Sequence, residues 1–255
     1  MGRGRYWALL DTGSNRTVVS HRLGGRFPTV RRSTMRSVFR ELETRIVRIP
    51  SIEVLGKQYE RRPAVVRPRA SDSVLSWTLL LGTDVLLDRR LTVDFRARRV
   101  EAGRRGPSAR SGGSVPLRCA RGRPFVRARL GGRPVVAFVD TGSPLCSLNP
   151  NFGRAGARSV RKERITDGSG ARSWEPVYRG PRLTLGPWDL GRPEFTRESM
   201  AILERFFRTR VDMVLGCGVL RAAGGAWTFE RRQGWLGWSP TAAPGRHASS
   251  PVPQR

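Results

Sequence analysis

Short apolar runs rich in β-branched and aromatic residues recur along the chain, and glycine or proline bounds most of them. Runs of this kind are typical of β-strands. Clear examples are residues 135–142 (VVAFVDTG), 182–186 (RLTLG) and 226–238 (AWTFERRQGWLGW). Short helices are expected only at residues 84–89 (DVLLDR) and 199–207 (SMAILERFF). The pattern therefore predicts a mainly β protein.

The chain contains a long internal repeat. Residues 2–20 (GRGRYWALLDTGSNRTVVS) match residues 131–149 (GGRPVVAFVDTGSPLCSLN) at an offset of 129. Later landmarks recur in the same order, with only a small drift in offset, as short loop insertions would cause. These pairs are Gly56 with Gly186, Gly82 with Gly216, and Phe95 with Phe229. The repeat predicts two homologous halves in one polypeptide.

The repeat also predicts the domain boundaries. We expect an N-terminal lobe at residues 1–101 and a C-terminal lobe at residues 115–238. Residues 102–114 are rich in Gly, Ser and Arg and lack apolar periodicity, so they are interpreted as a linker. Residues 239–255 form a polar, proline-rich segment, which is interpreted as a disordered tail.

The tetrapeptide Asp-Thr-Gly-Ser occurs twice, at Asp11–Ser14 and Asp140–Ser143, each time directly after an apolar run. A plain turn is one interpretation, because Asp, Gly and Ser all favour turns. Duplication at matching places of a repeat, followed by LLG in one half and VLG in the other, argues against a turn without chemical function. The two aspartates are therefore the candidate catalytic residues.

The paired motif resembles that of retropepsins and pepsins, and the resemblance covers most of residues 1–238. It implies two retropepsin-like lobes that form a pseudo-twofold, single-chain dimer, and hence a monomeric protein. It implies that Asp11 and Asp140 activate a water for hydrolysis of a polypeptide, without a metal or cofactor. The Leu-Gly pairs become segments that support the two aspartate loops: Leu81, Gly82, Leu215 and Gly216.

The residues beside the aspartates have expected roles of their own. By the same resemblance, Thr12 and Thr141 lock the two loops together through hydroxyl hydrogen bonds, although β-preference alone also explains a threonine. Glycine lets the backbone pass tightly around the carboxylates, at Gly13 and Gly142. The hydroxyls of Ser14 and Ser143 are expected to donate to the aspartates, which would lower the apparent pKa of the pair.

A hairpin that covers the substrate is expected at residues 161–177 (RKERITDGSGARSWEPV), with Gly168 and Gly170 at its tip. An ordinary surface hairpin is the alternative interpretation. The equivalent stretch of the first half, residues 35–47, contains no glycine. We therefore expect unequal flaps, with the mobile one in the second half.

The two halves differ at their starts. The second half has a strand-like segment at residues 123–132 before its aspartate, whereas the first half begins ten residues before Asp11. We expect either that the true start lies upstream, with a possible export signal, or that the first lobe has lost a strand. The N-terminus shows no signal peptide and the chain has no apolar run approaching about 20 residues, so no membrane segment is expected. The compartment stays open.

A formal charge of +28 invites a nucleic-acid-binding interpretation. Lys57 and Lys162 are the only lysines, however, and the arginines are scattered along the chain. This distribution favours compositional bias, and specific nucleic-acid binding is not expected. Three cysteines without Cys-x-x-Cys spacing indicate neither a disulfide framework nor a zinc site.

Three functions therefore remain open. The leading prediction is an aspartic endopeptidase. The alternatives are a catalytically inactive peptide-binding or dimerisation module of the same fold, and a basic nucleic-acid-binding protein. Hydrolysis that a transition-state analogue inhibits separates the first from the second, and sequence-dependent binding at physiological salt identifies the third.

Overall fold

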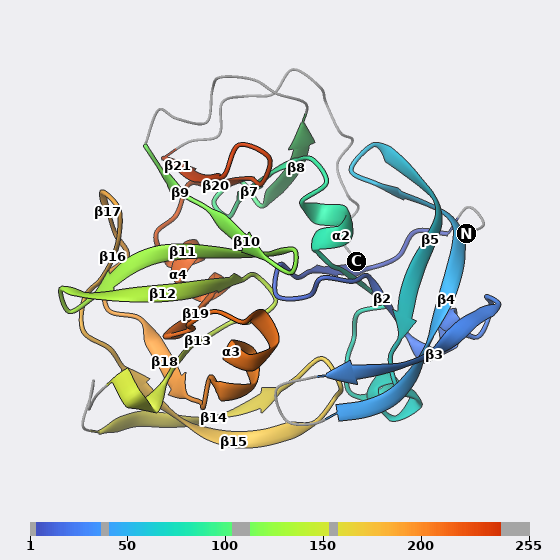
Figure 1. Cartoon of the computed structure of the whole chain (residues 1–255), viewed down its shortest axis with the longest axis horizontal. Coiled ribbons are helices and arrows are strands. Elements are labelled where there is room, and N and C mark those ends of the chain that lie inside the picture. The colour runs from blue at the N-terminus through green and yellow to red at the C-terminus, as the bar shows by residue number, and fades with distance from the viewer. Residues whose placement is uncertain (1–3, 37–40, 104–112, 153–157, 241–255) are drawn as a thin grey trace.

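The computed structural model describes residues 4–36, 41–103, 113–152 and 158–240 (Figure 1). Strands dominate these residues, so the prediction of a mainly β protein is confirmed. The helices are short: α1 (His21–Gly24), α2 (Thr83–Leu86), α3 (Ala201–Phe207), α4 (Cys217–Ala222) and the 3-10 turns η1 (Arg69–Ser73) and η3 (Pro150–Phe152). The helix expected at residues 84–89 ends at Leu86, because the chain turns there to enter the next strand.

The first half of the chain builds a six-stranded sheet, called here the N-terminal sheet. Its order is β1-β6-β2-β5-β4-β3. The strands are β1 (Ala8–Leu10), β2 (Val18–Val19), β3 (Thr29–Arg36), β4 (Glu41–Val54), β5 (Lys57–Val66) and β6 (Leu79–Leu81). The pair β1 and β6 is parallel, and this pairing holds the segment that leads into Asp11.

The second half builds the larger C-terminal sheet, in the order β14-β15-β18-β13-β19-β12-β11-β16-β17, with β10 paired to β11. The strands are β10 (Arg118–Ala120), β11 (Arg123–Leu130), β12 (Arg133–Asp140), β13 (Cys146–Leu148), β14 (Ser159–Thr166), β15 (Arg172–Arg179), β16 (Leu183–Leu185), β17 (Trp188–Asp189), β18 (Glu194–Arg197) and β19 (Met213–Gly216). Here β12 and β19 form the parallel pair, which ends at Asp140 opposite Gly216.

A third sheet joins the two halves, and we call it the shared sheet. Its order is β8-β7-β20-β21-β9, and Figure 1 shows it beside the C-terminal sheet. The strands are β7 (Arg90–Asp94), β8 (Arg99–Gly103), β9 (Ser114–Pro116), β20 (Ala226–Glu230) and β21 (Trp235–Ser239). The central pair β7 and β20 brings one strand from each half together, and Trp227 of β20 is fully buried.

The shared sheet corrects the boundaries expected for the linker and the tail. Residues 102 and 103 belong to β8, Ser114 opens β9, and Ser239 closes β21. Residues 104–112 and 241–255 lie outside the described residues. The sequence signal missed these strand ends because Gly and Ser, which form them, are ordinarily turn residues.

Most buried apolar residues form one core that runs through both halves. A second cluster lies under α3, where the rings of Phe125, Phe138 and Phe207 have centroids 4.9 to 5.3 Å apart. The three cysteines are free thiols. Across the described ranges, no helix has the length and apolar character needed to cross a membrane.

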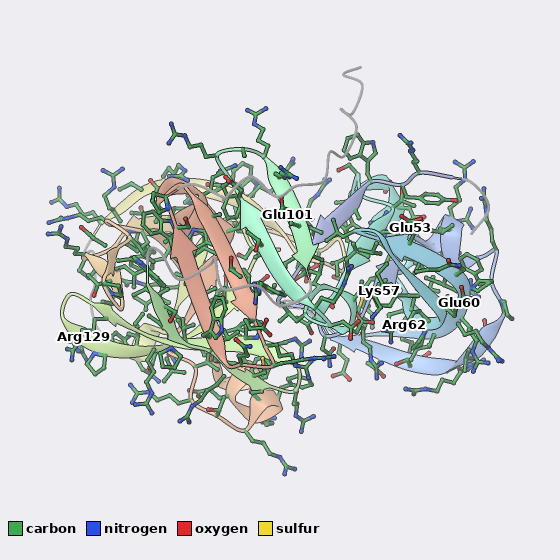
Figure 2. All side chains as sticks on the ribbon, turned by 90° about the horizontal axis from the view of Figure 1, so that it is seen from above. Glu53, Lys57, Glu60, Arg62, Glu101 and Arg129 are labelled. Atoms are coloured by element: carbon green, nitrogen blue, oxygen red, sulfur yellow. The ribbon has the colours of Figure 1, made fainter. Side chains whose placement is uncertain are left out.

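The positive charge is distributed over the surface of the protein. In Figure 2, side chains with nitrogen at their tips project around the whole outline of the described residues, from Arg129 at one end to Arg62 near the other. Several of these arginines lie in ion pairs with neighbouring acids, such as Arg161 with Glu163 and Glu194. No single face concentrates the basic side chains in this view.

Candidate active site

The two aspartates lie at matching positions, each at the end of the strand that leads into an Asp-Thr-Gly-Ser loop. Asp11 follows β1, and its backbone N–H donates to Leu81 O of β6 at 3.0 Å. Asp140 is the last residue of β12 and pairs with Gly216 of β19. We call residues 11–14 and 140–143 the first and second aspartate loops. In both halves, a parallel strand pair fixes where the loop begins.

Hydrogen bonds between the threonines interlock the two loops. The hydroxyl of Thr12 donates to Val139 O at 2.8 Å and accepts from the backbone N–H of Thr141 at 3.0 Å. The hydroxyl of Thr141 repeats this arrangement, donating to Leu10 O at 2.7 Å and accepting from Thr12 N–H at 3.0 Å. Thr12 is fully buried. The hydroxyl hydrogen bonds expected between the two loops are therefore present.

The glycines of the loops allow the aspartates to approach each other. A Cβ atom added to Gly142 would lie 2.6 Å from Cγ of Asp11, and one added to Gly13 would collide with the carboxyl of Asp140. Each carboxyl group thus packs against the glycine of the opposite loop. The two acidic side chains consequently lie face to face. A residue larger than glycine at position 13 or 142 would displace the carboxyl group packed against it.

This proximity perturbs both carboxyl groups. Burial is the largest cause that raises the pKa of Asp11 well above its ordinary value, and the negative charge of Asp140 raises it further. Burial also raises the pKa of Asp140, whereas a hydrogen bond from the Asp11 carboxyl and the backbone N–H groups of Gly142 and Ser143 oppose the rise. Two such carboxyls share one proton. The hydrogen bond between the two side chains raises the pKa of Asp11 and lowers that of Asp140, which favours the arrangement with the shared proton on Asp11.

The Leu-Gly pairs support the loops from behind. A Cβ atom on Gly82 would lie 2.5 Å from Arg16 O, and one on Gly216 would collide with Leu145 O. The backbone that follows each aspartate loop therefore passes directly over the glycine of its Leu-Gly pair. In both halves the residue after the glycine donates its backbone N–H to the loop serine at 2.8 Å, from Thr83 to Ser14 O and from Cys217 to Ser143 O. The leucines of the two pairs, Leu81 and Leu215, are buried.

The expectation for the serine hydroxyls is wrong. The hydroxyl of Ser14 donates to Arg16 O at 2.8 Å, and that of Ser143 donates to Leu145 O at 2.8 Å. The backbone N–H of Ser14 is the group that donates to Asp11 Oδ1, at 3.0 Å. The turn that follows each serine brings a carbonyl oxygen closer to its hydroxyl than the carboxylate is. Among the groups of the two loops other than the carboxyls themselves, backbone N–H donors rather than serine hydroxyls oppose the rise in the pKa values of the aspartates.

Sequence reasoning missed Arg123, which comes from β11 and reaches the opposite aspartate loop. Its Nε donates to Gly13 O, while Nη1 is buried and has no hydrogen-bond partner among the described residues. The guanidinium lies over the rings of Phe206 and Phe207, at 4.9 and 5.4 Å. Burial lowers the pKa of Arg123 to about 10, which leaves it charged at neutral pH. Its charge favours the ionised form of Asp140.

The β14–β15 hairpin is present where the sequence predicts it, with Gly168 and Gly170 in its tip. The side chain of Asp167 closes the tip by accepting from the backbone of Ser169 at 2.9 Å and of Ala171 at 3.0 Å. The hydroxyl of Ser71 in η1 donates to Ser169 O. The tip of a C-terminal hairpin is therefore attached to the N-terminal half. Its mobility stays a prediction.

The first half contains the β3–β4 hairpin at the equivalent place, and residues 37–40 at its tip lie outside the described residues. The strands beside the aspartate loops differ more. In the C-terminal sheet β12 lies between β11 and β19, whereas β1 in the described N-terminal sheet has β6 alone as a neighbour. The described residues of the first half thus lack a counterpart of β11, the strand that carries Arg123.

A scan of the chain against known protein families found no match. A search of curated proteins likewise found none. Throughout the described residues, no group of three or more His, Cys, Asp or Glu side chains is placed to hold a metal ion.

Proposed function

We propose that the protein is an aspartic endopeptidase with Asp11 and Asp140 as its catalytic residues. The observation that carries the proposal is the pair of facing carboxyl groups, each packed on the glycine of the opposite loop and fixed by the threonine hydrogen bonds. We further propose that the N-terminal and C-terminal sheets are two retropepsin-like lobes that face each other as a single-chain pseudodimer.

The unequal protonation of the pair supports a division of roles. Asp140, as the anion, accepts a proton from a water that attacks the peptide carbonyl. Asp11, as the acid, donates its proton to the carbonyl oxygen, which gives a neutral tetrahedral gem-diol. Asp140 then gives the proton it took from water to the leaving nitrogen while Asp11 takes a proton from a hydroxyl of the gem-diol, so that the C–N bond breaks and the pair returns to its starting protonation. Fixed loops lower the activation free energy of this reaction, because the two carboxyl groups are already held in position.

A polypeptide substrate agrees with the mainly β architecture. Extended peptides bind by hydrogen bonding to exposed backbone, with alternate side chains entering pockets. In this proposal the β14–β15 hairpin lies across the substrate, and its contact with Ser71 of η1 holds it in the closed position. Opening of that contact admits the substrate.

The decisive experiment is hydrolysis of a denatured protein across the acidic to neutral pH range. Cleavage should be inhibited by a statine-type transition-state analogue and abolished by Asp140→Asn, because the amide cannot act as a base. The variant should keep the circular dichroism spectrum of the parent protein. Undiminished cleavage by correctly folded Asp140→Asn would exclude the proposal.

One observation favours a second candidate, an inactive peptide-binding or dimerisation module. In the described residues β1 has one neighbouring strand, and such an edge positions the first aspartate loop less firmly than β12 positions the second. This candidate predicts that the analogue binds while no peptide is cleaved. The nucleic-acid alternative receives less support, since basic side chains surround the molecule in Figure 2 rather than gathering on one face.

A further inference from the structure

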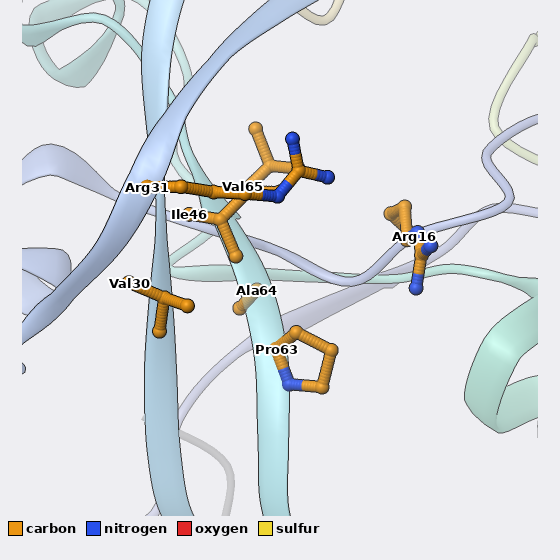
Figure 3. A pocket seen from close by; sticks show the side chains of 7 residues that line it. All are labelled: Arg16, Val30, Arg31, Ile46, Pro63, Ala64 and Val65. Carbon is orange, nitrogen blue, oxygen red and sulfur yellow. The ribbon is translucent and has the colours of Figure 1, made fainter.

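A cavity of about 220 Å³ opens on the N-terminal sheet, beside the segment that follows the first aspartate loop. Figure 3 shows its lining, which comes from three neighbouring strands and one loop. The lining residues are Val30 and Arg31 of β3, Ile46 of β4, Pro63, Ala64 and Val65 of β5, and Arg16 of the loop. We call this cavity the Arg16–Arg31 pocket.

The pocket has an apolar wall and a cationic rim. Val30, Ile46 and Ala64 form part of the wall, and Val30 keeps 47% of its surface exposed in the protein alone. Arg16 and Arg31 bring two guanidinium groups, and in Figure 3 the side chain of Arg31 extends over the wall toward the side on which Arg16 lies. Such a pocket fits a side chain with an apolar stem and an anionic end.

Neither guanidinium is neutralised by the protein. Within the described part of the chain, Arg16 and Arg31 have no ion pair and no side-chain hydrogen bond. The charge of Arg16 does act on Asp84, but that carboxyl accepts its hydrogen bond from the hydroxyl of Thr17 at 3.1 Å. Two unpaired positive charges on one rim repel each other, and a bound carboxylate relieves that repulsion.

The pocket is physically connected to the aspartate loop. Arg16 lies five residues after Asp11, and its carbonyl accepts the hydroxyl of Ser14 at 2.8 Å. The backbone of Arg16 also packs directly on Gly82 of the supporting segment. A strand advances about 3.3 Å per residue. Substrate selection by this pocket requires that a residue a few positions from the scissile bond of an extended substrate reach this region.

We propose that the Arg16–Arg31 pocket binds a glutamate side chain of the substrate and makes the protein a glutamate-selective peptidase. The methylene groups of the glutamate pack on Val30, Ile46 and Ala64, and its carboxylate binds the two guanidiniums. Glutamate is preferred to aspartate because it has one methylene group more to pack on this apolar wall. The proposal rests on the peptidase function proposed above and names the substrate class of the same site.

Mapping of cleavage sites in a library of unfolded peptides tests the proposal first. Glutamate should be enriched at one fixed position relative to the scissile bond. Matched peptides with glutamate, glutamine or phosphoserine at that position then give kcat/KM values at low salt. We expect the glutamate peptide to exceed the glutamine peptide about tenfold, as charge-assisted hydrogen bonds imply. Faster cleavage of the phosphoserine peptide would overturn glutamate as the occupant.

The variants locate the preference. Arg31→Gln should reduce the glutamate-to-glutamine ratio to roughly threefold, and Arg16→Gln with Arg31→Gln to about one. Arg32→Gln is the matched control, since Arg32 follows Arg31 on β3, points to the opposite face and carries the same charge. It should keep the parental ratio. An equal loss of the ratio in the control would assign the preference to overall charge and overturn the pocket.

Failure of the pocket and failure of the peptidase function give different results. Cleavage without any preference for glutamate overturns the pocket and leaves the peptidase function intact. If no peptide is cleaved, the peptidase function fails, and fluorescence anisotropy of the labelled glutamate peptide decides about the pocket. Weaker binding to Arg31→Gln than to Arg32→Gln would then support the pocket, whereas equal binding would overturn it.

Discussion

Replacement of Thr12 by valine tests the interlock between the two aspartate loops. Valine keeps the shape of threonine but removes the hydroxyl, and with it the hydrogen bonds to Val139 O and Thr141 N–H. Because Thr12 is fully buried, water cannot replace the lost partners. Each unsatisfied buried group costs about 1–3 kcal/mol. The substitution should therefore lower the unfolding free energy by about 2–6 kcal/mol, a large part of the 5–15 kcal/mol typical of proteins.

Urea denaturation followed by tryptophan fluorescence measures this loss. With an m-value of about 2–3 kcal/mol per molar urea, the midpoint should fall by roughly 0.7–3 M. Thr12→Ser is the matched control, because it keeps the hydroxyl and removes one methyl group at a cost of about 1 kcal/mol. If valine at position 12 destabilises the protein no more than serine does, the hydrogen bonds contribute nothing measurable and the reasoning is refuted.

Three further predictions concern the carboxyl pair. Arg123→Gln removes a positive charge that favours ionised Asp140, so the acidic limb of the pH profile of kcat/KM should move toward higher pH. Arg123→Lys keeps the charge and should move the limb less, and an unmoved limb in Arg123→Gln would contradict the electrostatic role. Gly13→Ala places a methyl group against the opposite carboxyl, so activity should fall at least about 100-fold, whereas Gly103→Ala, with nothing within 4 Å, should keep the parental rate. Ser14→Ala combined with Ser143→Ala removes hydroxyls that bind carbonyl oxygens, so the pH profile should stay where it is, and a shift of that profile would show that the hydroxyls do reach the aspartates.

The aspartate loops were predictable because their constraints are local and occur twice. Each loop needs a carboxylate, a threonine hydroxyl and a glycine in succession, directly after a strand, and few sequences satisfy this by chance. The glycines of the Leu-Gly pairs, Gly82 and Gly216, were found for the same reason. Another segment of backbone passes directly over each of them, which leaves no room for a side chain at these positions. The repeat then brought the two sets of residues into correspondence.

Other features depend on contacts that no local pattern encodes. Arg123 is one arginine among many in a chain with 48 basic residues, and its approach to Gly13 exists only after β11 lies beside the opposite loop. The direction of a serine hydroxyl depends on which carbonyl lies nearest, and the turn after Ser14 decides this. The shared sheet was missed because β7 and β9 take partners from distant parts of the chain, β20 and β21 respectively.

The shared sheet also links the proposed activity to the order in which the chain is synthesised. Strand β7 needs β20, a partner about 135 residues later in the chain, and a ribosome adds some 5–20 residues per second. Until β20 and β21 have emerged, the nascent N-terminal half lacks the sheet that attaches it to the second aspartate loop. A chain made only as far as residue 225 thus carries Asp11 and Asp140 without the shared sheet, and in the proposed mechanism proteolysis begins only after residues 226–239 have been synthesised.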